Sequence, residues 1–83
     1  MSGLNVEIVS IEGIVFKGLC FQVVVPSISG DMGIMSQHEA FIVKLREGDI
    51  CIFDEKNVNT KNFKVNSGFA EMTSEDKLTI ILN

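Results

Sequence analysis

The residues most capable of chemistry lie around His38, which is the chain's only histidine. Asp31 and Ser36 precede it in a segment that separates two apolar stretches. A hydrolytic site needs a nucleophile within hydrogen-bond reach of a base. Ser36 does not stand in the pattern of a nucleophile elbow, and nothing in the sequence ties Ser67 to this segment. We therefore expect no catalytic residues, and His38 is either a loop histidine that hydrogen-bonds its neighbours or an interface residue.

Metal and cofactor sites are not indicated either. A zinc site needs three or four closely spaced ligands, whereas the chain offers one histidine and two separated cysteines. Asp31, His38 and Glu39 together would at most hold a weak surface cation. The segment Gly30-Asp31-Met32-Gly33 is not a phosphate-binding loop, because it lacks the lysine and the following helix of that motif. The expectation is therefore no metal and no cofactor.

Size and charge narrow the class of protein. The chain has 83 residues, a net charge of -4 and a hydrophobic fraction of 46%, which predicts one domain with a thin core and some apolar surface for a partner. Nucleic acid is not an expected partner, because binding it requires a basic face.

Cys20 and Cys51 lie inside apolar runs and are expected to be buried thiols. The first residues lack a signal-peptide pattern and no segment is long enough to span a membrane, so we expect a cytoplasmic location.

The elements that position these residues are short strands separated by turn residues. Apolar and polar residues alternate from Leu4 to Ser10, as in a half-buried strand. We predict further strands over residues 14–16, 19–25, 33–35, 40–45, 50–53, 60–65, 69–72 and 78–82. Strands this short, with frequent turns and no long helical period, predict an all-β sandwich or barrel.

Glycine and proline mark the expected interruptions between these strands. We predict that a strand ends at Pro26 and that residues 27–33 form a loop. Gly18 is expected to lie at a turn, and Gly48 is the candidate for a positive φ in a turn over residues 46–49.

Six sequence motifs, in order and with nearly ungapped spacing, resemble the N-terminal β domain of the epsilon subunit of the rotary ATP synthase. The resemblance covers nearly the whole chain. His38 stands at the family's histidine and Gly48 at its turn glycine, although prolines usual on both sides of the histidine are missing here. The other matching segments are Asn5-Val6-Glu7-Ile8-Val9-Ser10, Phe16-Lys17-Gly18, Gly30-Asp31-Met32-Gly33-Ile34-Met35, Ser67-Gly68-Phe69-Ala70-Glu71-Met72 and Leu78-Thr79-Ile80-Ile81-Leu82.

The resemblance implies a single domain over residues 1–83, folded as a flattened β-sandwich of about ten short, mostly antiparallel strands. It implies a non-catalytic rotor subunit of the central stalk, which binds gamma and the c ring and couples rotation, driven by protons or sodium ions, to ATP synthesis. Such a subunit lies on the cytoplasmic face of the bacterial inner membrane as a peripheral part of the complex. The family's C-terminal helical hairpin would begin at Asn83, and both a naturally short protein and a shortened one fit that end.

The resemblance also implies two interfaces. The expected contacts with the c ring are Ser29, Gly30, Asp31 and Met32, with Asp31 placed to pair with a basic loop. The expected contacts with gamma are Ser10, His38 and Phe41. Phe41 is expected to be either an aromatic anchor of this interface or a core residue.

The competing interpretation of the whole chain is a free-standing β-sandwich module that binds another protein; an OB-like nucleic-acid domain and a small enzyme are weaker alternatives.

Overall fold

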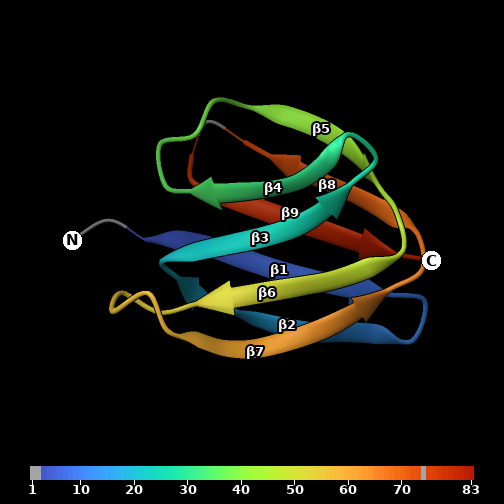
Figure 1. Cartoon of the computed structure of the whole chain (residues 1–83), viewed down its shortest axis with the longest axis horizontal. Coiled ribbons are helices and arrows are strands. Elements are labelled where there is room, and N and C mark those ends of the chain that lie inside the picture. Colours follow the sequence, from blue (N-terminus) through green and yellow to red (C-terminus); the bar gives the residue numbers. More distant parts are fainter. Residues whose placement is uncertain (1–2, 74) are drawn as a thin grey trace.

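The computed structural model describes residues 3–73 and 75–83, and within these ranges it contains nine strands and no helix. Figure 1 labels the strands and colours them along the sequence, from blue at the N-terminus to red at the C-terminus. Their bounds are β1 Leu4–Ser10, β2 Gly13–Cys20, β3 Gln22–Ser27, β4 Gly30–Met35, β5 Phe41–Leu45, β6 Gly48–Phe53, β7 Asn59–Val65, β8 Gly68–Met72 and β9 Lys77–Leu82. The prediction of an all-β fold built from short strands is confirmed.

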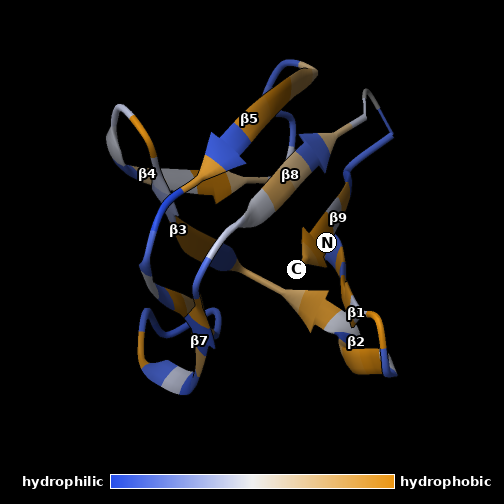
Figure 2. Cartoon of the chain, turned by 90° about the vertical axis from the view of Figure 1, so that its right-hand side faces the viewer, coloured by the Kyte–Doolittle hydropathy of each residue, from blue (hydrophilic) through white to orange (hydrophobic). Residues whose placement is uncertain are grey.

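The strands form one continuous sheet that folds over into two layers (Figure 2). The hydrogen-bonded order is β2-β1-β9-β8-β5-β3-β6-β7, with β4 paired to β3. β5 joins β3 through one residue pair, Ser27 with Leu45, so the sheet bends there. β1 and β9 run parallel, and the other pairs of neighbours are antiparallel. The result is the mostly antiparallel sandwich that the sequence predicts.

The core follows from the alternation of side chains along each strand. In β1, Leu4, Val6 and Ile8 are buried, whereas the residues between them face outward. β8 and β9 repeat this pattern and place Ala70, Met72, Leu78 and Ile80 in the same interior. At the open side of the sandwich the rings of Phe16 and Phe63 lie 5.6 Å apart and close the gap between β2 and β7.

Three predictions about turns are wrong in detail. β3 continues through Pro26 to Ser27 and β4 begins at Gly30, so the predicted loop over 27–33 shrinks to two residues. Gly18 lies inside β2, where its missing side chain leaves room for the Phe16 ring. Gly48 begins β6 and does not have a positive φ. It is needed for close approach instead, because a Cβ there would lie 2.8 Å from Cβ of Pro26.

The two cysteines differ in their surroundings. Cys20 is buried and Cys51 is partly exposed, and both are free thiols. Burial raises the pKa of Cys20 above its ordinary value. Burial also raises the pKa of Cys51, with a further contribution from the negative charges of Asp49 and Asp31. The expectation of a buried thiol is thus confirmed for Cys20 and is only partly met by Cys51.

Candidate interaction surfaces

The four residues predicted to contact the c ring lie at the turn between β3 and β4. Ser29 belongs to the turn itself, and Gly30, Asp31 and Met32 begin β4. Ser29 and Asp31 are exposed. Met32 packs partly against the core and is therefore not freely available to a partner. The structure brings the four together, with the exposed part of the set confined to residues 29–31.

The backbone of this turn is held on both sides. The Ser27 side chain is buried; its hydroxyl donates to the Gly30 carbonyl oxygen at 2.6 Å and accepts from the Ser29 amide at 3.2 Å. From the neighbouring strand β5, the Lys44 carbonyl accepts from the Ile28 amide at 3.0 Å. The Arg46 amide donates to the Pro26 carbonyl at 2.8 Å. These bonds fix the turn before any partner is bound.

Sequence analysis missed two residues at this turn. Arg46 Nη2 lies 2.8 Å from Asp31 Oδ1, so the carboxylate already has a cationic partner within the chain. Ile28 is exposed at the turn, with 63% of its surface accessible. Hairpin turns of two residues usually carry Asn, Asp or Gly, so an isoleucine there was an available signal. The proximity of Arg46 depends on the pairing of β3 with β5 and carried no local signal.

The three residues predicted to contact gamma are split between two ends of the molecule. His38, in the loop between β4 and β5, lies beside Phe41 at the start of β5, with ring centroids 5.1 Å apart in an edge-to-face arrangement. His38 Nδ1 lies 2.9 Å from the Glu39 carbonyl oxygen. Ser10 pairs with Gly13 at the β1–β2 turn, at the opposite end of the strands (Figure 1). Phe41 also packs partly against the core, so both of its expected roles match its position.

A row of apolar side chains crosses the outer face of β2, β1, β9 and β8, the strands that run between these two ends. The strand register places Ile14 beside Val9, Val9 beside Ile81, and Ile81 beside Phe69. The accessible fractions of Ile14, Ile81 and Phe69 are 61%, 47% and 46%. We call Ile14, Val9, Ile81 and Phe69 the apolar row. The next row along the strands is mainly polar and consists of Lys17, Glu7, Thr79, Glu71 and Ile42.

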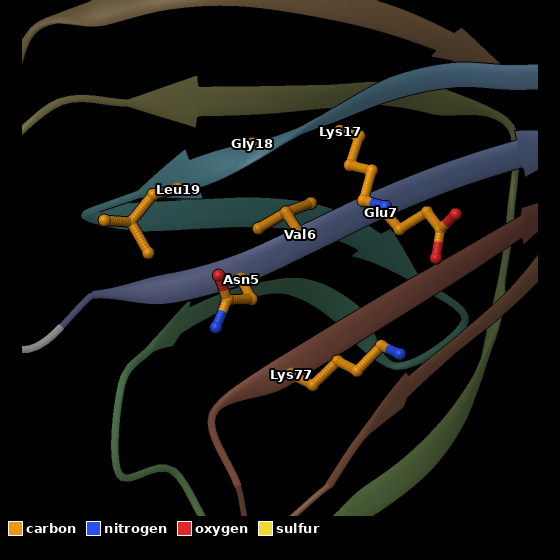
Figure 3. A pocket seen from close by; sticks show the side chains of 7 residues that line it. All are labelled: Asn5, Val6, Glu7, Lys17, Gly18, Leu19 and Lys77. Atoms are coloured by element: carbon orange, nitrogen blue, oxygen red, sulfur yellow. The ribbon is translucent and has the colours of Figure 1, made fainter.

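A shallow depression of about 220 Å³ lies on the same outer face. Figure 3 shows Lys17 and Glu7 close to each other, with Lys77 on the neighbouring strand. The lining of the depression contains two amines, one carboxylate and one carboxamide, but no serine, threonine, cysteine or histidine. The remaining lining residues are Asn5, Val6, Gly18 and Leu19. Such a lining offers ionic and hydrogen-bonding contacts.

Among residues 3–73 and 75–83, no group of three or more histidine, cysteine or carboxylate side chains is placed to hold a metal ion. Over the same described ranges, no helix is long and apolar enough to cross a membrane.

Comparison with protein families decides the relationship. The model of the ATP synthase Delta/Epsilon chain, beta-sandwich domain, matches residues 3–83. The chain belongs to this family. It is 36% identical over 81 residues to the ATP synthase epsilon chain of Alkalilimnicola ehrlichii and 40% identical over 76 residues to that of Endomicrobium trichonymphae. These alignments cover 98% and 92% of this chain.

The relatives differ in length. This chain spans 56% and 54% of the Alkalilimnicola and Endomicrobium proteins, about half of each. By contrast, it spans 91% of the epsilon chain of Caulobacter vibrioides, to which it is 35% identical over 81 residues. Membership of the epsilon family therefore applies to the β-sandwich part that all three share.

Solved structures agree on the fold. A chain in the Euglena gracilis mitochondrial ATP synthase, solved with its OSCP, F1 and c-ring parts, superposes with a TM-score of 0.89 at 14% identity. That alignment covers 99% of this chain and 51% of the other. A chain in the central stalk and c ring of the Tetrahymena thermophila enzyme gives a TM-score of 0.77 at 16% identity, with coverage of 98% and 63%. This chain therefore shares its fold with chains of these two ATP synthases.

Proposed function

We propose that this chain is a non-catalytic rotor subunit of a rotary ATP synthase, located in the central stalk, where it binds gamma and the c ring. In this role it transmits rotation of the ring to the catalytic head, so that ion flow is coupled to ATP synthesis. It is then a peripheral component on the cytoplasmic face of a bacterial inner membrane. Family membership and the central-stalk setting of the similar folds support this function.

The apolar row is the observation that carries the gamma contact. Three of its four side chains are exposed and Val9 is partly exposed, and apolar surface that continues across neighbouring strands in this way marks sites of protein association. A gamma surface that reached from Ser10 to His38 would cross this face. The interface we propose therefore joins the predicted residues Ser10, His38 and Phe41 through Ile81 and Phe69.

The proposed contact with the c ring uses the turn between β3 and β4. Ser29, Gly30 and Asp31 lie there at the end of the molecule. Met32 supports these residues from the core side. A body with contacts on a face and at one end suits the transmission of torque, because paired strands packed in two layers resist deformation between the contacts.

The experiment is a binding measurement with purified gamma, using two matched charge insertions. Phe69→Glu places a carboxylate in the apolar row, and we expect its affinity for gamma to fall at least tenfold. Met35→Glu is the control, because Met35 has a similar exposure of 41% but lies on β4 in the other layer. Equal affinities for both variants and the unchanged chain would contradict the proposed gamma face.

A further inference from the structure

The turn between β3 and β4, which we call the tip, displays an isoleucine next to an ion pair whose two side chains are also exposed. Its only carboxylate, on Asp31, is paired with the guanidinium of Arg46. The same guanidinium donates from Nη1 to the Glu47 carbonyl oxygen at 3.0 Å. Arg46 thus links β4 to the β5–β6 turn.

Ile28 is the apolar part of this tip. Neither Ile28 nor Ser29 has a positive φ, whereas the following Gly30 does, at 125°. A β-branched residue has little to gain locally at a hairpin turn. Its amide is nevertheless held by the Lys44 carbonyl while 63% of its surface stays accessible. The backbone is fixed and the side chain is displayed.

A partner can contact this tip in two ways, through the charge of Asp31 or through the side chain of Ile28. A basic partner loop that paired with Asp31 would bring a second cation next to the Arg46 guanidinium, which already lies 2.8 Å from this carboxylate. A partner that contacts Ile28 leaves the ion pair intact and meets a turn whose backbone is already ordered. The second arrangement uses the contacts that the structure already has.

We propose that Ile28 is the residue with which this tip contacts the c ring, and that Arg46 is a positioning residue that holds the tip through Asp31. This proposal rests on the proposed function, because it takes the c ring as the partner. It replaces a direct ionic contact of Asp31 by an indirect role of that residue.

The test measures the affinity of the full chain, in complex with gamma, for purified c rings in detergent. Ile28→Ser is expected to weaken binding about tenfold, as for an apolar anchor of an interface. Ile11→Ser is the matched control, because Ile11 is 96% exposed in the β1–β2 turn at the same end of the molecule. We expect the control to bind as the unchanged chain does. Equal affinities for the two variants would overturn the role of Ile28.

A charge swap separates the positioning role from direct pairing. Arg46→Asp and Asp31→Arg, made singly, are each expected to weaken binding several-fold, because like charges then face each other. The double variant restores the ion pair in reverse and is expected to recover most of the affinity. A double variant as weak as Asp31→Arg would show that Asp31 pairs directly with the ring and would overturn the positioning role.

Thermal unfolding of each variant shows whether it is folded. Arg46→Lys keeps the positive charge opposite Asp31, and we expect it to retain binding to the c ring. If the unchanged chain with gamma did not bind the ring at all, the proposed function would fail together with this inference. If the unchanged chain binds the ring but the double variant does not recover affinity, only the role of Arg46 would be contradicted.

Discussion

The two ends of β4 are held in different ways. At its start, the tip of residues 27–31 is fixed by backbone hydrogen bonds, by the buried Ser27 hydroxyl and by Arg46. At its end, the loop of residues 36–40 has a backbone bond from the His38 amide to the Met35 carbonyl and two side-chain contacts: the Gln37 amide donates to the Asp76 carboxylate, and His38 packs on Phe41. The comparison indicates that the tip has a fixed backbone shape, whereas the loop depends on a few replaceable contacts.

The largest expected effect is a loss of folding stability at Gly68, where the backbone is closely packed at the same end of the molecule as the tip. Gly68 begins β8 with φ 157°, and a Cβ there would lie 2.1 Å from the Ile81 carbonyl oxygen. Because this clash involves backbone, Gly68→Ala should destabilise the fold by about 3 kcal/mol or more. Gly30→Ala is the control, since its Cβ would meet nothing within 4 Å and only φ is strained, at about 1 kcal/mol. Denaturant unfolding measures both, and equal losses would contradict the tight packing at Gly68.

The next effect concerns the buried hydroxyl of the tip. Ser27→Ala removes the hydroxyl that bonds Gly30 and Ser29, and we expect a loss of about 1–2 kcal/mol in the free energy of unfolding. Ser10→Ala removes a bond to the Glu12 amide in an exposed turn and should cost less than about 0.5 kcal/mol. Chemical denaturation of the two variants gives the comparison. A larger loss for Ser10→Ala would reverse the assignment of the tip as the more firmly held turn.

The loop at the other end of β4 should depend on the aromatic contact. A double-mutant cycle with His38→Ala and Phe41→Leu is expected to give a coupling of about 0.5–1 kcal/mol, as for other edge-to-face ring pairs. The four unfolding free energies that form the cycle supply the measurement. Strictly additive losses would mean that the two rings do not stabilise the loop.

The smallest effect is a pH dependence from Cys20, which lies opposite Leu4 at the loop's end of the molecule. Burial raises the pKa of this thiol in the folded protein. The folded state therefore retains the proton to higher pH than the unfolded state, and this contribution to stability is lost as the pH rises through the folded-state pKa. Cys20→Ala should flatten the loss of stability in alkaline solution, measured from neutral pH upward. An unchanged alkaline slope would contradict the assignment to Cys20.

Much of the sandwich could be predicted from local patterns, because a half-buried strand must alternate. β1, β8 and β9 show this, since each buried residue is separated from the next by an outward-facing one. Gly18 and Gly48 were misread as turns because glycine serves close packing as well as chain reversal, and the sequence does not distinguish the two uses.

The surfaces were only partly predictable. The segment with Asp31 and His38 stood out by its residue types, but the Arg46 partner lies 15 residues away and depends on how β3 meets β5. The apolar row was equally hidden, since Val9, Ile14, Phe69 and Ile81 become neighbours only through the register of β1, β2, β8 and β9. Pairing across strands determines such sets, and a single sequence does not display it.

The central claim is that the chain acts through two separate surfaces, a face for gamma and a tip for the c ring. The most direct measurement is photo-crosslinking in the assembled enzyme, with a photoreactive residue placed at Ile81 in one preparation and at Ile28 in another. We expect the Ile81 position to yield a product with gamma and the Ile28 position a product with a c subunit. Products with one and the same partner from both positions, or with neither partner, would contradict the claim.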